Sequence, residues 1–464
     1  MWCPRRDPQG RLRLLHPVWP HGQLRLIPIR PVPPAPPARA GGTGGAPVDT
    51  RWHWRHLLLA PHRLGFFLAL VGLVAAGAWW ALVQLDRLSG LLGLHYAVPA
   101  VLVHSAVMTF GFIPLFFSGF LFTAGPKWLG VQPPEPRQLL QPLLLQTAGW
   151  LLWLVAAHVH PWMAVAALLV AALGLAHMAA IYWVLVRRST VDDQLHARTI
   201  GVALLVGCAS LAALALAVVL GAYAVALACV HTALWGLVVV VYVSVAHRMI
   251  PFFTSSAMPF INAWRPFWAL GLMLTVAAVE VLAVWVELGG VPGGAVGAAW
   301  TLGRGIFELA AGGVLLWLSV VWGLMQSLKN RLLAMLHVGF LWLGLALVLG
   351  GVAQCLGVLQ GTPVLRLGAL HALSMGCLAS LMLAMVTRVS CGHSGRALVA
   401  DGLVWGLFWM LQLATVLRIA AAAHAALAQW LLLPAVLLWV GIMLIWGTRL
   451  GSWYGRLRAD GRPG

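Results

Sequence analysis

The stretch HALSMGCLASLMLAMVTRVSCGHSGR, residues 371–396, decides the fold class of this chain. Residues 371–387 include no acid, lysine or arginine. A helix needs about 20 predominantly apolar residues to cross a hydrocarbon core of about 30 Å. We therefore expect this stretch to form a membrane-spanning helix, with histidines near both ends and methionines between them.

The composition of the whole chain supports an integral membrane protein. Of its 464 residues 61% are hydrophobic and only 9% are charged, and the mean hydropathy is +0.91. A soluble domain has roughly 25% charged residues, and the strands of a membrane barrel would alternate apolar and polar positions. The apolar runs here are continuous, so we predict an all-α integral membrane protein.

Long apolar runs predict about twelve transmembrane helices. They lie near residues 62–86, 97–122, 139–157, 161–186, 199–220, 222–247, 266–289, 305–324, 331–353, 364–389, 399–421 and 425–447.

The net charge of +18 does not indicate nucleic-acid binding, because the basic residues sort by side of the membrane. Of the 29 Lys and Arg residues, all but four lie in the termini or in the loops that follow even-numbered helices. The exceptions are Arg87, Arg304, Arg366 and Arg418. Positive residues stay on the cytoplasmic side, so we predict a multi-pass membrane protein with both termini in the cytoplasm.

The sequence divides into a tail, a membrane domain and a second tail. Residues 1–55 are basic and Pro-rich, which favours a disordered cytoplasmic tail or a mis-called start of the gene. Residues 56–450 form the polytopic helical domain, and residues 451–464 form a short basic cytoplasmic tail. The six cysteines show no CxxC motif, so no disulfide framework or thiolate zinc site is indicated.

Three histidines are predicted to share one depth near the outer face. His104, His231 and His371 lie about seven, nine and seven residues into helices that run inward, so their depths agree within ~3 Å at ~1.5 Å per residue. Met108 and Met375 each follow a histidine by four residues and therefore project from the same helix face. Imidazole with thioether suits copper, and two imidazoles suit the axial positions of haem iron. Packing histidines and core methionines are the alternative interpretation.

Further polar residues lie toward the predicted cytoplasmic face. We expect a second histidine layer of His177, His247 and His337, with His393 just outside it. Arg388, His393 and Arg396 in TRVSCGHSGR are donors that suit carboxylates such as haem propionates, or alternatively lipid phosphate.

Few acids lie inside the predicted helices. We expect Arg304 to pair with Glu308, and Glu280 to be either a structural carboxyl or a proton-conducting group.

Four segments together resemble the NnrS family. They are MTFGFIPLFFSGFLFTAGPKWLG (residues 108–130), VAHRMIPFFTSS (245–256), KNRLLAMLHVGFLWLGLAL (329–347) and the opening stretch, and the resemblance covers roughly residues 60–450. It implies a twelve-helix bacterial inner-membrane protein that carries haem and copper and takes part in the nitric oxide response, denitrification and resistance to nitrosative stress.

The resemblance also implies site residues. His371 and His393 fall on the family's His-Ala-Leu and Gly-His-Thr-Gly-Arg motifs, with Ser394 where threonine is usual, and His337 falls on a Leu-His motif. Many members carry His-x-His-Glu-Met in the second helix, whereas this chain has only His104 with Met108. Combining both lines of reasoning, we predict cofactor binding by His104, His231, His337, His371, Arg388, His393 and Arg396, and metal binding by His104, His231, His371, Met108 and Met375.

Three functions follow from these residues. The first is a haem and copper protein whose small-molecule ligand is nitric oxide, with an unidentified electron donor. The second is a quinol-linked nitric oxide reductase-like oxidoreductase, which the absence of any His-His dipeptide disfavours. The third is a proton-coupled transporter that uses Glu280 and the histidines. Whether the protein is an enzyme stays open at this point.

Overall fold

The structure is a computed structural model that describes residues 4–6, 12–14, 51–262, 264–291, 293–361 and 365–460. The chain divides into two units, Met1–Val48 and Asp49–Gly464. In the first unit, strand β1 (Pro4–Arg6) pairs antiparallel with β2 (Leu12–Leu14). The disorder predicted for the rest of residues 1–50 falls outside the described residues.

The second unit contains twelve helical spans long and apolar enough to cross a membrane, counted over the described residues. The spans are α1 (Pro61–Ser89), α2 with α3 (Ala100–Phe110 and Ile113–Leu129), α4 (Pro136–Val159), α5 (Pro161–Arg188), α6 (Leu195–Val219), α7 with η2 and α8 (Tyr223–Ala233, Leu234–Val239 and Val240–Ala257), α9 (Phe267–Leu288), α10 (Gly294–Val321), α12 (Arg331–Gln360), α13 with η3 and α14 (Arg366–His371, Ala372–Ala379 and Ser380–His393), α15 (Gly402–Ala423) and α16 (Ala425–Tyr454).

The predicted all-α membrane fold is confirmed, and several helices are longer than predicted, the sixth and eighth spans most of all. The sixth span continues to Ala257 through Pro251, and the eighth begins at Gly294, so parts of both predicted connections are helical. Two short helices, η1 (Trp54–Leu59) and α11 (Leu324–Ser327), lie outside the spans.

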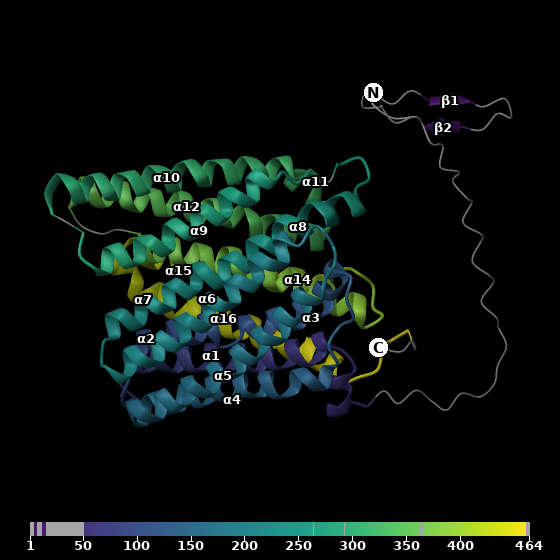
Figure 1. Cartoon of the computed structure of the whole chain (residues 1–464). Helices are drawn as coiled ribbons and strands as arrows, with labels where there is room; N and C mark the ends of the chain where they lie inside the picture. The colour runs from purple at the N-terminus through teal and green to yellow at the C-terminus, as the bar shows by residue number, and fades with distance from the viewer. Residues whose placement is uncertain are drawn as a thin grey trace. The chain divides into compact units, whose positions relative to one another are not determined.

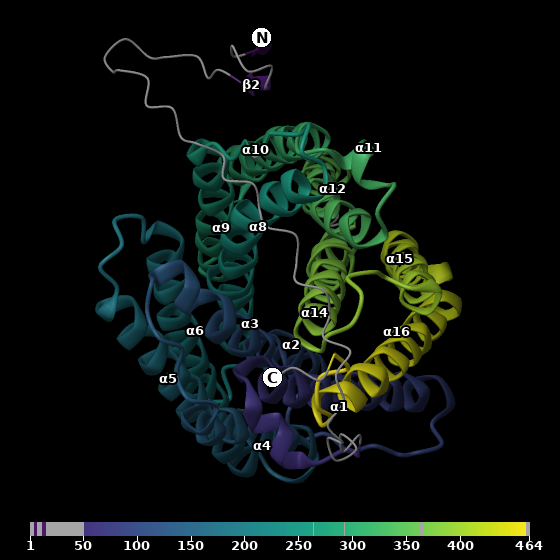
Figure 2. The same cartoon turned by 90° about the vertical axis from the view of Figure 1, so that its right-hand side faces the viewer.

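The spans run side by side along one direction (Figure 1). Seen end-on, α10 and α12 lie on one side of the bundle, α4, α5 and α6 on another, and α15 and α16 on a third (Figure 2). Helix α14 contacts α12, α15, α16 and α3. Large apolar side chains face outward, such as Val155 and Leu173, which are each 64% exposed. Lipid rather than water is the solvent that suits such a surface.

Small residues allow the closest helix contacts. A Cβ atom added at Gly312 of α10 would lie 2.8 Å from the carbonyl oxygen of Gly344 on α12. Backbones approach this closely where small residues face one another, as is common between membrane helices.

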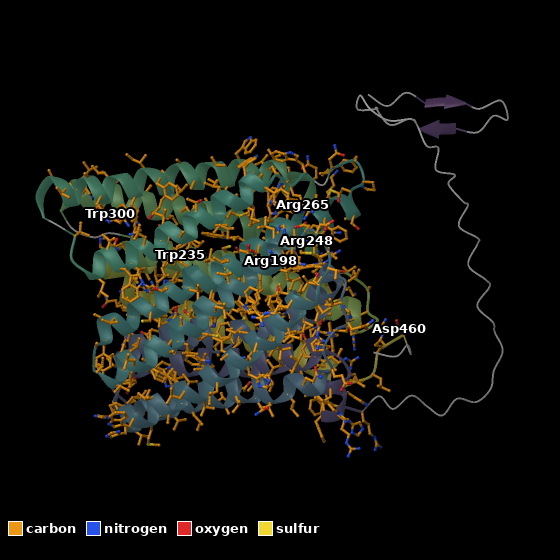
Figure 3. All side chains as sticks on the ribbon, in the orientation of Figure 1. Arg198, Trp235, Arg248, Arg265, Trp300 and Asp460 are labelled. Atoms are coloured by element: carbon orange, nitrogen blue, oxygen red, sulfur yellow. The ribbon has the colours of Figure 1, made fainter. Side chains whose placement is uncertain are left out.

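Basic residues gather toward one end of the bundle. Arg248 and Arg265 lie toward the end that carries Asp460, whereas Trp300 lies toward the opposite end (Figure 3). This separation agrees with the charge sorting on which the predicted topology rests.

Candidate functional site

A cavity of about 370 Å³ lies among α1, α2, α7, η3, α15 and α16. Its walls are mostly apolar, with a few polar side chains that include His104, His231 and His371. Pockets of ~300–1,000 Å³ with this lining are typical of cofactor and ligand sites. The three histidines that the sequence placed at one depth therefore line one cavity.

His371 has one ring nitrogen fixed by the backbone. Its Nδ1 lies 2.7 Å from the carbonyl oxygen of Leu367. A carbonyl only accepts hydrogen bonds, so Nδ1 carries the hydrogen, and the neutral ring keeps its lone pair on Nε2. Metal-bound histidines commonly donate their second N–H to a backbone carbonyl in this way.

His104 lies flat against an aromatic ring. Its ring centroid is 3.9 Å from that of Trp80, with 18° between the planes. Its Nδ1 is buried and has no hydrogen-bond partner among the described residues. His371 and Arg418 lie within electrostatic range of His104. A buried imidazole nitrogen without a partner is a candidate ligand atom, because burial without a bond costs free energy.

His231 and two methionines complete the candidate donor set. Met108 and Met375 line the same cavity as His231. Across the described residues, no group of three His, Cys, Asp or Glu side chains is positioned to hold one metal ion. The three imidazoles therefore surround a larger volume than a single ion fills.

Each of the three histidine-bearing spans departs from α-helical geometry beside the cavity. The second span breaks between α2 and α3 at Gly111 and Phe112. The π-helical segment η2 begins three residues after His231, and η3 begins directly after His371. Short π-helical segments inside α-helices occur frequently at functional sites. The backbone geometry and the side chains thus both indicate that this cavity is the functional site.

Two arginines face the cavity from its sides. Arg87 of α1 and Arg418 of α15 both line it. Arg418 lies within electrostatic range of both His104 and His371. Two guanidinium groups beside an apolar cavity suit a ligand that carries carboxylates.

A network of charged side chains, centred on the largely buried Arg304, lies close to the cavity. Arg304 of α10 contacts Glu280 and Glu287 of α9 and Glu308 of its own helix. The predicted pair of Arg304 and Glu308 is present, with 2.8 Å between Nε and Oε1. Arg366, next to the cavity residue Leu367, joins the network at Glu287.

Comparison with known protein families identifies the family of this chain. The model of the NnrS protein family matches residues 56–458. The chain belongs to the NnrS family. A comparison with curated proteins finds no match to the chain. The region that matches the NnrS family contains all twelve spans and every residue that lines the cavity.

The other predicted cofactor residues of this NnrS-family chain lie outside the cavity lining. His337 of α12 is fully buried, and its Nε2 lies 2.9 Å from Oγ1 of Thr254. That hydroxyl donates to the carbonyl of Ile250, so it accepts from the imidazole.

The predicted cluster at the end of α14 is also separate from the cavity. The Arg388 guanidinium lies 4.0 Å from the Phe253 ring centroid, and that of Arg396 lies 4.3 Å from Trp453. The His393 ring is 4.5 Å from that of His62. Burial lowers the pKa of Arg396, which lies just after the span. The described contacts of these residues are aromatic rings and not the cavity histidines.

The second histidine layer is not gathered into one site. His177 is exposed on α5. His247 is buried, and its Nδ1 lies 3.0 Å from Nε2 of His196, while its Nε2 lies 3.1 Å from the carbonyl of Pro266. Through these contacts His247 joins three segments of the chain, namely its own helix, the helix of His196 and the segment at Pro266.

The sequence analysis missed Trp80, Gln84, Arg87, Tyr242 and Arg418 as cavity residues. A signal for the arginines was available. The four cations that break the charge sorting are Arg87, Arg304, Arg366 and Arg418, and the structure places each in the cavity wall or in the carboxylate network. A basic residue on the side where such residues are rare is therefore a useful marker of a site.

Proposed function

We propose that this NnrS-family protein binds haem and copper in the histidine-lined cavity and that nitric oxide is the ligand of that site, within the inner membrane of a bacterium. The observation that carries the proposal is the convergence of His104, His231 and His371 from three spans on one otherwise apolar cavity. Family membership supports a role in the response to nitric oxide.

The residues present fit the cofactors. His371 keeps Nε2 free for a metal because Nδ1 donates to the carbonyl of Leu367. His104 lines the same cavity, and its Nδ1 has no hydrogen-bond partner among the described residues. These two imidazoles would hold the haem iron, and nitric oxide would take the place of one of them. Met108, Met375 and His231 offer the sulfur and nitrogen donors that copper accepts.

The cavity arginines would orient the haem. Arg87 and Arg418 offer planar donors that match carboxylates in geometry and charge. We assign them to the propionates in place of Arg388 and Arg396, which contact aromatic rings elsewhere.

The bound cofactors would supply a metal that coordinates nitric oxide and carries single electrons. The chain supplies the surroundings. Apolar walls that include Phe112, Leu378 and Val436 exclude water and favour a small neutral ligand. Nitric oxide is apolar enough to reach such a cavity from the lipid.

Metal analysis with visible spectra tests the proposal. The purified protein should contain haem and copper, and the spectrum of the reduced protein should shift when nitric oxide is added. His371→Ala and His104→Ala should lower the haem content by more than about tenfold, since ligand loss exceeds the usual effect of outer-shell changes. His177→Ala, on the exposed face of α5, is the matched control. Protein made with ample haem and copper that contains neither metal would overturn the proposal.

A further inference from the structure

The Arg304 network holds more negative than positive charge. Nη2 of Arg304 lies 2.6 Å from Glu280 Oε2, Nε lies 2.8 Å from Glu308 Oε1, and Nη1 contacts Glu287. Arg366 adds a second cation, 2.5 Å from Glu287 Oε2. Three carboxylates therefore face two guanidinium groups, which leaves one negative charge without a partner.

An unpaired charge is expensive at this position. Glu280 is 4% exposed and Glu308 is 3% exposed, and both lie inside membrane spans. Burying a carboxylate without a partner costs several kcal/mol even after relaxation. One added proton removes the excess charge completely.

The contacts of Glu308 indicate where that proton resides. Nε of Arg304 is directed at Glu280 Oε1, 3.3 Å away, although Glu308 Oε1 is nearer. Oε1 of Glu308 consequently has no well-aligned donor among the described residues. The Glu308 and Glu280 carboxyls both contact the guanidinium group of Arg304, at 2.8 and 2.6 Å, and therefore lie close to each other. A proton on Glu308 turns this close approach of two acids into a hydrogen bond.

We propose that Glu280 and Glu308 share one exchangeable proton and form a proton-holding site for the histidine-lined cavity. In this pair the Glu308 carboxyl donates to the Glu280 carboxylate, which also accepts from Arg304. Two acids this close cannot both ionise easily, so they titrate as a pair.

The surroundings favour one proton and no metal ion. Helix α9 packs against α7, η2, α8 and α10. The ionisable groups on and around this pair are Arg304 of α10, Glu287 of α9, His231 of α7, Cys355 of α12 and Arg366 of α13. Arg304 occupies the position between the three carboxylates that a metal ion would need.

The network is connected to the cavity. His231 lies within electrostatic range of Glu287 and Arg366, and Arg366 directly precedes the cavity residue Leu367. The Glu287 side chain is 30% exposed and therefore offers a route for proton exchange with the surroundings. The supply of a proton to the cavity rests on the proposed function, whereas the sharing of a proton between Glu280 and Glu308 does not.

Infrared spectroscopy of the full-length protein tests the shared proton. The chain has only 11 acidic residues, so a carboxylic-acid C=O band at neutral pH is assignable. We expect such a band in the native protein, and we expect it to shift after transfer to D₂O. Glu308→Gln and Glu280→Gln should each abolish it, because the remaining carboxylates then balance the two arginines. Glu135→Gln, at an exposed acid outside the network, is the matched control and should keep it.

The outcomes separate this inference from the proposed function. Absence of the band in the native protein, or a band that survives both network substitutions, would overturn the shared proton. A band that does not shift in D₂O would overturn its role as an exchangeable store. The presence of the band is measured on the native protein, without any substitution. A variant that fails to fold therefore leaves this part of the test intact. A protein with the band but without haem would contradict the proposed function and keep the proton pair.

Discussion

Deleting one residue from η3 should remove His371 from the cavity without destroying the span. A π-helical turn contains one residue more than an α-helical turn. Deletion of Leu373 should therefore convert η3 (Ala372–Ala379) into α-helix. Of the two helical segments that flank the deletion, the one that is held less firmly must then rotate by about 100° about the helix axis and shift by about 1.5 Å along it.

The part of the span that contains α13 should move, because the part that contains α14 is fixed by more contacts. Ser380 accepts from Gln412 at 2.9 Å, Thr387 accepts from Trp446 at 3.0 Å, and Ser390 lies 2.6 Å from the Tyr454 hydroxyl. Helix α13, before the deletion, has only six residues.

The resulting displacement is far larger than a metal site tolerates. A ring ~5–6 Å from the helix axis moves by about 8 Å when the helix turns by 100°. Metal–ligand distances must hold to about 0.2 Å. The deletion should therefore abolish haem binding through His371.

Haem per polypeptide, taken from the visible spectrum and protein concentration, measures the effect. Leu373→Ala is the control, because it removes the same side chain and keeps the length of the helix. We expect near-normal haem with the substitution and more than a tenfold loss with the deletion. Equal haem contents in the two variants would refute the reasoning.

Three further predictions concern stability, which is measured as the thermal unfolding midpoint with tryptophan fluorescence as the signal. Arg304→Met leaves its buried carboxylates without their cation and should destabilise the protein by about 3–5 kcal/mol; an unchanged midpoint would show that the network is not structural. Asp401 caps α15, and its Oδ1 lies 3.1 Å from Nη1 of Arg449. Asp401→Asn should lower the stability by about 0.5 kcal/mol, and Asp401→Ala by about 1 kcal/mol more, because asparagine keeps the cap. Equal midpoints for the two variants would argue against the cap. Burial raises the pKa of Asp401, but its hydrogen bonds with Arg449 and with the backbone N–H groups of Val404 and Leu403, together with the charge of Arg449, lower it by more in sum. The folded-state pKa is thus below the unfolded one, and this stabilisation, present above about pH 4, should disappear as the pH falls through the folded-state pKa. A Cβ at Gly376 would lie 2.5 Å from the Trp342 ring, so Gly376→Ala should cost about 1–3 kcal/mol, and Trp342→Leu in the same chain should recover part of it; a strictly additive double variant would contradict the clash.

Most of the fold was predictable because the bilayer imposes a length on each helix. The twelve apolar runs and their order are confirmed, and each has the length that the hydrocarbon core requires. The errors lie where helices extend beyond the predicted run, and the extension is longest at Ala257 and Gly294. Proline and glycine at these positions do not prevent helix formation, so the loops predicted from composition were too long.

The candidate site was only partly predictable. Counting residues along a span gives depth, which is why His104, His231 and His371 were grouped correctly. Depth does not say which helices are neighbours, and so His337 and His247 were grouped with residues that they do not contact. His371 and His393 are 22 residues apart on one span, or ~33 Å at ~1.5 Å per residue. One haem cannot contact both ends of that distance.

The π-helical segments were not predictable from periodicity. Both are apolar and continuous with α-helix on either side, so their hydrophobic pattern does not reveal the extra residue. Their position follows from packing between spans, which is a property of the assembled bundle.

The contact between the first and last spans has a consequence for how the protein is made. Arg63 of α1 is buried and donates to the carbonyls of Tyr454 and Arg456, at 3.2 and 2.7 Å. Helix α16 also supplies Val436 and Trp439 to the cavity wall. During synthesis, the ribosome must therefore finish the last span before the first can settle, and the cavity stays open to lipid until then. Any large flat cofactor would enter a nearly complete chain, after translation has reached its final helix.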